Sequence, residues 1–395
     1  MKTAGVGTLR ASLLHGVASG LAACLGCVPP IGPLAAAEPG FNVVTVAEGL
    51  EDPWAIAALP DGDLLVSEKA GRLRLIHDGK LQAAPIEGAP KVRVGGQGGL
   101  MDVVLAPDFA SSRWVYMTIA KPNADDSLGT TALVRARFDG TRLVDLQEVV
   151  ETEAWGEARS HYGTRATFDA SGHVFLSLAD RSSFYKTGRD LSEHPAQQLD
   201  NHMGKVLRLN LDGSVPADNP FVGRSGALPE IYTYGHRDPQ GLAYRPETGE
   251  LWSVEHGPVG GDELNLLRAG RNYGWPIVSK GANHVDTTGF HSIPSRADME
   301  EPRFVWPTAI APSNIVFYSG KRFPAWRGNA LISSLVGQRL VRVEFNGSEA
   351  VSASTLLEGR GRIRDVHEGS DGSIYLAIAG GEGAKSPILR LEPTE

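Results

Sequence analysis

A glycine-containing turn that separates two short apolar strands recurs along this chain. The turns fall near residues 62, 112, 172, 249, 328 and 372, and the copy near 112 is the weakest. Stretches such as RLVRVEF and ALVRARF alternate apolar and polar residues, which is the periodicity of a strand. The clearest copies are PDGDLLVSEKAGRLRLI from Pro60, ASGHVFLSLADR from Ala170, ETGELWSVEHG from Glu247, WRGNALISSLVGQRLVRVEF from Trp326 and SDGSIYLAIAGGEGAKSPILRLE from Ser370.

Repeated units of this size, each one a small sheet, are typical of a β-propeller. The repeat predicts an all-β fold, a six-bladed β-propeller of four-stranded antiparallel blades around a central channel. The pattern alone leaves a β-sandwich, or two separate β domains, open as the alternative. The 47 glycines and 25 prolines of the chain favour many short strands joined by turns. An α/β fold is disfavoured, because long helical periodicity is missing from the sequence.

Residues 1–37 are predicted to be a signal peptide, which leaves 38–395 as a single propeller domain. Basic Lys2 and Arg10 precede a small-residue apolar run, and LAAAE (Leu34–Glu38) offers a cleavage site after Ala37. The alternative is a lipoprotein signal with an anchor at Cys24, because LAAC resembles a lipobox. Both signals predict an exported protein that is periplasmic or secreted.

Length, charge and cysteine use limit the possible partners. With 395 residues, of which 42% are hydrophobic, the chain can bury a large core. The formal net charge of −8 argues against nucleic acid or an anionic membrane as the main partner. No further apolar run reaches the length of about 18 residues that a membrane span needs. Both cysteines, Cys24 and Cys27, precede the cleavage site after Ala37, so we expect no disulfide and no thiolate metal site in the mature chain.

Two loops carry the first candidate residues. GGQGGLMDV (Gly95–Val103) has glycines on both sides of Gln97, which let the backbone approach another group closely. It lacks the pattern of a phosphate loop, and a tight turn between blades is the alternative. SHYGTR (Ser160–Arg165) places His161 just before a predicted strand, where a histidine can act as a general base near neutral pH. Asp180 follows that strand's hairpin in LADR and can orient His161, although a structural histidine is the alternative.

The stretch YGHRDPQGLAY (Tyr234–Tyr244) carries the next candidates. Its HRD is not a kinase catalytic loop, because no Asn follows at the required offset and Pro239 follows the Asp. Arg237 remains a planar, permanently charged donor suited to carboxylates or quinone oxygens.

A second arginine cluster lies in GRGRIRDVHEG (Gly359–Gly369). Arg360, Arg362 and Arg364 alternate with other residues and are expected on one side of a strand. Three like charges on one face require an anionic partner, either protein carboxylates or a polyanionic ligand.

The acidic, glycine-rich stretch EHGPVGGDELN (Glu255–Asn265) is the fourth candidate. Carboxylates and backbone carbonyls together are the ligands that Ca²⁺ prefers, although the acid spacing is not that of an EF-hand. The alternative is a solvated acidic turn in which Asp262 caps a local structure.

In combination and in this order, the motifs resemble the soluble sugar dehydrogenases that depend on pyrroloquinoline quinone, the glucose/sorbosone type. The aldose sugar dehydrogenases of bacteria are the most similar branch. The resemblance runs from about Gly49 to Pro393 and rests on the motifs GQGGLMDV, GHRDPQGLAY, EHGPVGGDELN, GRNYGWP and RIRDV. It implies a six-bladed propeller, in agreement with the repeat, and oxidation of an aldose at C1 with hydride transfer to the quinone.

The resemblance also implies a role for each candidate. His161 matches the general base, Asp180 the acid that supports it, and Arg237 the arginine over the quinone carbonyl. Gln97 matches a contact to cofactor and substrate. The remaining matches are Arg362 and Arg364 to the arginine pair at the cofactor's carboxylates, the Gly257 and Pro258 carbonyls to the catalytic Ca²⁺ site, and Glu263 with the Tyr273 carbonyl to a second, structural Ca²⁺ site.

The chain departs from the family pattern in four places, which puts the substrate in doubt. Asp238 stands where the family usually has Asn, which adds a negative charge beside the cofactor-binding residues and puts quinone affinity in doubt. Val336 aligns with a Lys of the glucose-oxidising branch, and Ser160 with an Asp of that branch. IAGGEGAK in the last blade replaces a threonine–aspartate turn.

Two alternatives to an exported quinoprotein remain from the sequence. One is a propeller of the same ancestry that has lost catalysis and binds a carbohydrate or protein, which Asp238 favours. The other is a calcium-dependent lactonase, which needs several inward acidic or amide side chains. The natural electron acceptor is expected to be external, because the chain has no C-x-x-C-H haem motif.

Overall fold

The computed structural model describes residues 40–182, 190–281, 292–381 and 383–394. The described residues form one compact unit. The predicted signal peptide, with Cys24 and Cys27, lies outside the described residues. Within the described ranges, no helix is long and apolar enough to cross a membrane.

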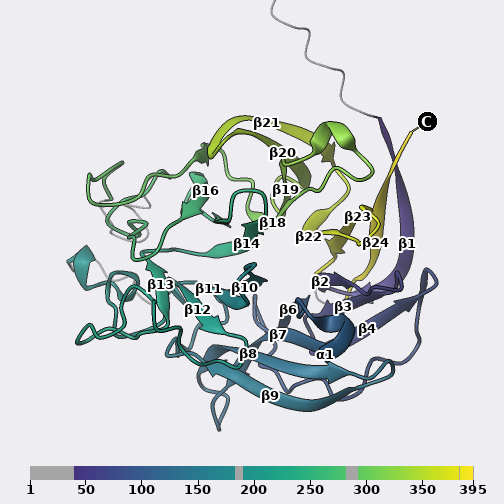
Figure 1. Ribbon diagram of the computed structural model, residues 1–395, viewed down its shortest axis with the longest axis horizontal. Helices are drawn as coiled ribbons and strands as arrows, with labels where there is room; N and C mark the ends of the chain where they lie inside the picture. The colour runs from purple at the N-terminus through teal and green to yellow at the C-terminus, as the bar shows by residue number, and fades with distance from the viewer. Residues whose placement is uncertain (1–39, 183–189, 282–291, 382, 395) are drawn as a thin grey trace, which may run out of the picture. The chain divides into compact units, whose positions relative to one another are not determined.

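In these ranges the structure has six four-stranded antiparallel sheets, so the predicted six-bladed β-propeller is confirmed. The first strand of each blade lies nearest the centre of the ring in Figure 1 and contacts the first strand of both neighbouring blades. These inner strands are β2 (Pro53–Ala58), β6 (Leu100–Leu105), β10 (Gly163–Phe168), β14 (Pro239–Arg245), β18 (Pro312–Phe317) and β22 (Arg362–Glu368).

Three further strands complete each blade toward the rim. The second strands are β3 (Leu64–Glu68), β7 (Trp114–Pro122), β11 (His173–Leu178), β15 (Glu250–Glu255), β19 (Ala330–Ser334) and β23 (Ile374–Ala379). The third strands are β4 (Arg72–His77), β8 (Gly129–Phe138), β12 (Lys205–Asn210), β16 (Asp262–Leu267), β20 (Arg339–Asn346) and β24 (Lys385–Pro393). The outer strands are β5 (Lys80–Leu81), β9 (Leu143–Glu151), β13 (Ile231–Tyr234), β17 (Phe304–Trp306), β21 (Glu349–Glu358) and β1 (Phe41–Glu51).

Short helices occupy a few connections. They are α1 (Phe109–Ser112) and the 3₁₀ helices η1 (Leu191–Glu193), η2 (Pro195–Gln197) and η3 (Pro324–Trp326).

The recurring turns of the sequence are the hairpins between the first and second strands of the blades. In five blades a glycine with positive φ makes the turn, for example Gly62 at 95° and Gly172 at 84°. In the weakest copy, α1 fills the hairpin and Arg113 takes the left-handed conformation at φ 60° instead. That residue carries a Cβ into a region that favours glycine, which explains why this copy lacks the sequence signal.

The ring is closed by the first strand of the chain. β1 pairs with β24 along its length, from Phe41 opposite Pro393 to Glu51 opposite Lys385. The N-terminal and C-terminal strands therefore share one blade, and closure removes the free edge that a linear row of blades would expose.

The hydrophobic core lies between neighbouring blades. One cluster joins Trp54 and Leu65 of the first blade to Met101 and Met117 of the second. The other large clusters repeat this arrangement at the remaining blade contacts. The apolar faces of the strands are thus used for packing blade on blade, which leaves the strand ends and loops for polar chemistry.

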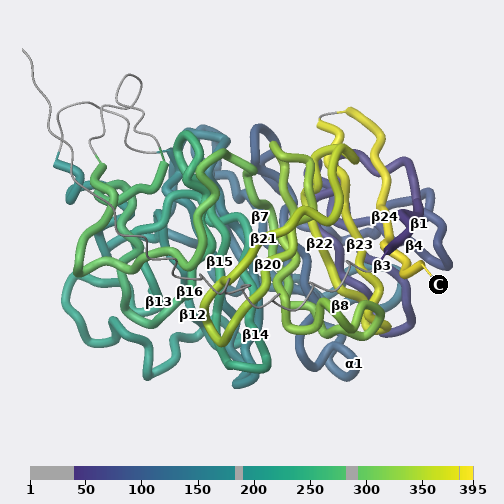
Figure 2. Tube along the Cα trace, turned by 90° about the horizontal axis from the view of Figure 1, so that it is seen from above, coloured from purple at the N-terminus to yellow at the C-terminus, as the bar shows by residue number. Residues whose placement is uncertain are grey.

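Each inner strand is irregular at its beginning. The pairing register shifts between Pro53 and Ala55, and at the same place in the other inner strands. Such bulges redirect side chains and are common beside active sites. The inner strands of a propeller all start on one face, seen edge-on in Figure 2, so the bulges form a layer just below that face.

Candidate active site

The predicted site residues lie where inner strands begin. Gln97 precedes β6, His161 precedes β10, Arg237 and Asp238 precede β14, and Arg362 opens β22. Segments far apart in the sequence therefore meet at one face of the ring, around the centre of Figure 1.

His161 and Asp180 form a hydrogen-bonded pair. The loop before β10 holds His161 at φ 51°, and its Nδ1 lies 2.7 Å from Oδ1 of Asp180, which follows β11. Asp180 is buried and accepts a further hydrogen bond of 2.8 Å from the Trp275 indole N–H. An ionised carboxylate requires a proton on Nδ1, so Nε2 is the nitrogen of His161 that can accept a proton.

Electrostatics favour an ionised Asp180 beside a basic His161. Burial raises the pKa of Asp180, but His161, His194 and Arg237 together outweigh burial, so this pKa lies below its ordinary value. Burial lowers the pKa of His161, whereas Asp238 and Asp180 raise it above the ordinary 6.5. The second carboxylate, Asp238, therefore acts on the same imidazole from the neighbouring blade.

Gln97 contacts the backbone of the His161 loop. Its side-chain Oε1 accepts a hydrogen bond from the His161 N–H, and its own N–H donates to the Arg159 carbonyl at 2.8 Å. A Cβ on Gly96 would lie 2.2 Å from that same carbonyl. The close approach expected from the glycines therefore exists, and the loop of the next blade is what approaches.

Arg237 lies between a tryptophan and the acidic loop. Its guanidinium is 5.3 Å from the centre of the Trp275 ring, and Nη1 donates to the His256 carbonyl at 3.2 Å. Its backbone N–H donates to Glu255 at 3.0 Å. The buried Nε of Arg237 has no hydrogen-bond partner among the described residues, so this donor remains for a ligand.

Asp238 is fully buried, and its charged neighbours favour the ionised carboxylate. Its Oδ1 accepts a 2.8 Å hydrogen bond from Gln240, while Oδ2 lies 3.5 Å from Nδ1 of His256 and has no hydrogen bond within the described chain. Burial raises the pKa of Asp238, but His161, His256 and Arg237 outweigh it and hold the pKa far below the ordinary value. The departure from Asn thus adds a negative charge that is surrounded by positive or protonatable groups.

The acidic loop surrounds a small cavity. The cavity has a volume of about 20 Å³, which is enough for one water molecule or one ion. Its lining includes all four residues predicted as metal ligands, together with residues that the sequence reading missed; the set is Arg237, Glu255, His256, Gly257, Pro258, Gly261, Glu263, Tyr273, Trp275, Val278 and Ser279. Residues predicted for two separate calcium sites therefore border a single cavity.

Two carboxylates at this cavity share one amide. Asn265 Nδ2 donates to Glu255 at 2.9 Å and to Glu263 at 3.1 Å, and its buried Oδ1 has no hydrogen-bond partner among the described residues. Burial and the neighbouring Glu255 raise the pKa of Glu263 to about 8. Two acids this close are unfavourable unless a proton or a cation lies between them, so the donor set fits a divalent cation.

Asp262 has a structural role instead. Its Oδ1 accepts from the Gly257 N–H at 2.8 Å, and its Oδ2 accepts from Ile310 and Ala311, both at 2.7 Å. This carboxylate caps the loop, as the alternative interpretation of the acidic stretch expected, although it is buried rather than solvated.

The arginine cluster is divided by the bulge in β22. Arg362 is exposed, whereas Arg364 is partly buried, reaches Gln240 Oε1 at 3.4 Å and lies 5.6 Å from the Trp54 ring centre. Arg360 precedes the strand. The expectation that all three share one side of a strand is therefore wrong, because the register shifts between Ile363 and Asp365. Burial, and then Arg165, lower the pKa of Arg364 to about 10.

Sequence reasoning missed Trp275, Glu255 and Gln240 as functional side chains. Signals for all three were present, since each lies inside one of the motifs GHRDPQGLAY, EHGPVGGDELN and GRNYGWP. Their partners Asp180, Glu263 and Asp238 could not be paired with them from spacing alone.

The chain is similar to known proteins over most of its length. The sequence profile of the family described as Glucose / Sorbosone dehydrogenase matches residues 50–390. The chain is 36% identical over 365 residues to "Aldose sugar dehydrogenase YliI" of Escherichia coli, covering 91% of this chain and 94% of that protein.

Solved structures of the same type are similar over most of the chain. The soluble aldose sugar dehydrogenase of Escherichia coli in its apo form has a TM-score of 0.81 at 35% identity, covering 90% of this chain and 100% of that one. The aldose sugar dehydrogenase of Streptomyces coelicolor, in its form bound to PQQ (pyrroloquinoline quinone), has a TM-score of 0.72 at 29% identity. The match covers 90% of this chain and 99% of that one.

Proposed function

The chain belongs to the glucose/sorbosone dehydrogenase family, and from this premise we propose that it is an exported, periplasmic or secreted quinoprotein that oxidises aldose sugars at C1. The product is the lactone, and the cofactors are pyrroloquinoline quinone and Ca²⁺. The observation that carries the proposal is the His161–Asp180 pair at 2.7 Å, on the face that also holds Arg237 and the acid-lined cavity.

His161 is proposed as the general base. Since Nδ1 faces Asp180, Nε2 accepts the proton of the C1 hydroxyl as the C1 hydride leaves. Asp180 remains ionised, fixes the orientation of the ring and stabilises the imidazolium that forms. Gln97 holds the His161 backbone and thereby the position of Nε2.

The residues present fit both cofactors. The free Nε of Arg237 and the cations Arg362 and Arg364 would hold a polyanionic quinone, with Gln97 as a neutral contact. Glu263 and the backbone of Gly257, Pro258 and Tyr273 would hold Ca²⁺ at the small cavity, with Glu255 as a further carboxylate. When bound, the quinone supplies the hydride acceptor and Ca²⁺ the Lewis acid that polarises it.

Reconstitution tests this proposal. Chelator-treated protein receives Ca²⁺ and pyrroloquinoline quinone, singly and together, and dye reduction is followed with a panel of aldoses. Turnover that requires both additions supports the proposal and identifies the accepted sugars. Folded protein that binds no quinone would contradict it and favour a binding propeller without catalysis. Sugar-lactone hydrolysis that requires Ca²⁺ alone would favour the lactonase.

A further inference from the structure

Arg165 contacts each of the other five blades of the propeller through its guanidinium group. It donates from Nη1 to Asp102 at 2.9 Å and from Nε to the Gln240 carbonyl at 3.1 Å. Its Nη2 donates to the carbonyls of Ser313 and Arg364, both at 3.1 Å. Its guanidinium carbon lies 4.2 Å from the centre of the Trp54 ring.

These partners belong to the bulges of the inner strands. Trp54, Asp102, Gln240, Ser313 and Arg364 are all skipped by the pairing register, as is Arg165 itself. We call these six residues the bulge ring. A bulge leaves backbone groups without a partner in the sheet, so three of the carbonyls that Arg165 binds are ones that strand pairing does not satisfy.

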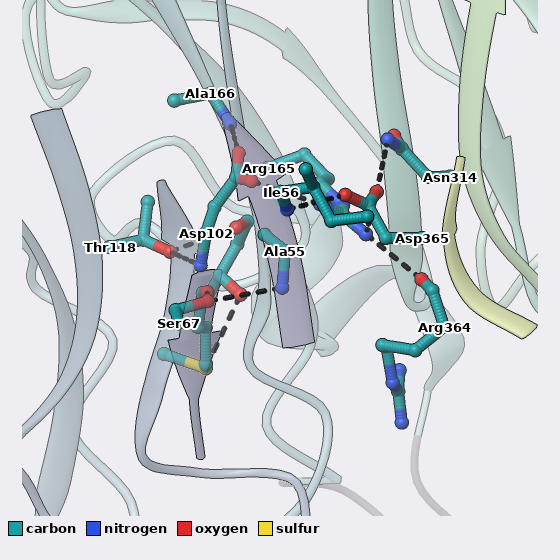
Figure 3. A network of polar contacts seen from close by, with 12 residues as sticks. Ala55, Ile56, Ser67, Asp102, Thr118, Arg165, Ala166, Asn314, Arg364 and Asp365 are labelled. Atoms are coloured by element: carbon teal, nitrogen blue, oxygen red, sulfur yellow. Dashed lines mark hydrogen bonds and ion pairs between the residues drawn. The ribbon is translucent and has the colours of Figure 1, made fainter. Parts of the chain in front are cut away.

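Two carboxylates hold Arg165 in the middle of the ring, as Figure 3 shows. Asp365 lies 3.0 Å from Nη2, and its Oδ2 accepts from the Ile56 N–H at 2.8 Å. Asp102 binds the opposite side of the guanidinium and accepts from the Ala166 N–H at 2.8 Å. Arg165 is a buried charge, with 2% of its surface exposed. The planar guanidinium fixes the directions of its N–H donors.

The bulge ring includes the candidate cofactor residue Arg364 and contacts a second one, Asp238, through Gln240. Arg165 binds the carbonyls of Gln240 and Arg364, and the side chains of these same two residues meet at 3.4 Å. Gln240 in turn donates to Asp238 at 2.8 Å. On the other side, Arg165 and the two carboxylates line a cavity of about 260 Å³ that continues along the later residues of the inner strands, such as Thr167 and Phe317.

We propose that Arg165 is a positioning residue, which fixes the bulged backbones of Gln240 and Arg364 and thereby places Asp238 and the Arg364 guanidinium for cofactor binding. This inference deepens the proposed function and rests on it for the identity of the ligand. The placement itself is a property of the cofactor-free protein, so it can be measured independently.

The test compares Arg165→Lys with Arg245→Lys. An ammonium keeps the charge but cannot bind three carbonyls and two carboxylates as a planar fork does. Arg245 is the matched control, because it is 9% exposed, donates to the Gly347 carbonyl at 2.8 Å and lies 4.9 Å from the Phe345 ring centre, at the far end of β14. Both variants are expected to lower the melting temperature.

Only Arg165→Lys is expected to weaken quinone binding. The expected loss is roughly 10- to 100-fold, which is typical when a residue that holds the ligand-binding side chains in place is replaced. The dissociation constant is measured by tryptophan fluorescence with Ca²⁺ present. Hydrogen exchange without quinone is then compared for peptides that contain the starts of β14 and β22. Faster exchange confined to those peptides supports the proposal. Unchanged quinone affinity, or exchange that rises equally across the blades as in Arg245→Lys, would overturn it.

Failure of the proposed function and failure of the role proposed for Arg165 give different results. If the parent protein binds no quinone, the proposed function fails, and the exchange pattern alone decides the role of Arg165. If Arg165→Lys does not fold, Asp102→Asn replaces it, since it leaves Arg165 in place and converts one of its two ion pairs to a neutral contact. The same local pattern of exchange is then expected, and a uniform pattern contradicts the proposal.

Discussion

The indole N–H of Trp275 donates a hydrogen bond of 2.8 Å to Asp180, a residue 95 positions earlier in the chain. The same ring lies 5.3 Å from the guanidinium of Arg237. One side chain therefore contacts both the acid that orients the proposed base and the cation beside the proposed cofactor. Replacing it tests whether these parts of the site depend on one another.

Trp275→Phe is expected to lower kcat by about tenfold while the fold is retained. The variant keeps an aromatic ring but removes a hydrogen bond to a buried carboxylate, which is worth roughly 1.5–3 kcal/mol. Steady-state kinetics of the reconstituted protein measure the effect, and circular dichroism checks the fold. A kcat equal to that of the parent would show that Asp180 does not need this donor.

His161→Ala is expected to abolish sugar oxidation and to leave quinone binding largely intact. General-base catalysis contributes about 10²–10⁴-fold, and the base acts on the sugar. His173→Gln is the control, because His173 forms a similar pair with Asp169 at 2.8 Å at the opposite end of the same blade. Oxidation by His161→Ala at the parent rate would refute the role of His161 in proton abstraction.

The activity is expected to rise with pH through a pKa above 6.5, since only neutral His161 accepts a proton and its neighbouring carboxylates raise its pKa. Asp238→Asn removes one of these charges, so the acid limb of the kcat profile should move to lower pH. Activity at high pH should be kept or raised. Total loss of activity in Asp238→Asn would mean that this protein uses the carboxylate directly.

Ca²⁺ is expected to raise the melting temperature of the parent and not of Glu263→Gln. A ligand at 100 times its dissociation constant stabilises the folded state by about 2.7 kcal/mol. Asp78→Asn serves as the control, because Asp63, His77 and Asp78 form an exposed cluster that can collect cations without a built site. An equal response to Ca²⁺ in parent and Glu263→Gln would exclude Glu263 as a ligand.

The metal-free protein should lose stability as pH rises from 4.5 to about 8, relative to Glu263→Gln. The folded state holds a proton on Glu263 up to about pH 8, whereas the unfolded chain releases it near 4.5, so the unfolded state binds fewer protons in this window. Chemical denaturation at several pH values measures the difference. Saturating Ca²⁺ should abolish this loss of stability with rising pH, and a loss that persists with Ca²⁺ would contradict the metal-site assignment.

Local sequence signals predicted the strands and turns from which the blades are built. The turns near residues 62, 172, 249, 328 and 372 are glycine hairpins at the same place in successive blades. Turn conformation and strand alternation depend on residues close together in the chain, so they can be read directly from it. Arg113 shows the limit, because a left-handed residue without glycine leaves a weaker signal at the hairpin near 112.

The sequence by itself determined the repeat, the alternation of apolar and polar residues along the strands, and the motifs that contain His161, Arg237 and Glu263. Only the tertiary structure decided which of these side chains meet. The bulges at the starts of the inner strands shift each register, and Arg364 is therefore partly buried while Arg362 is exposed. Closure of the ring then brings five distant segments onto Arg165, because the distances across a channel depend on all the blades at once and on no single stretch of chain.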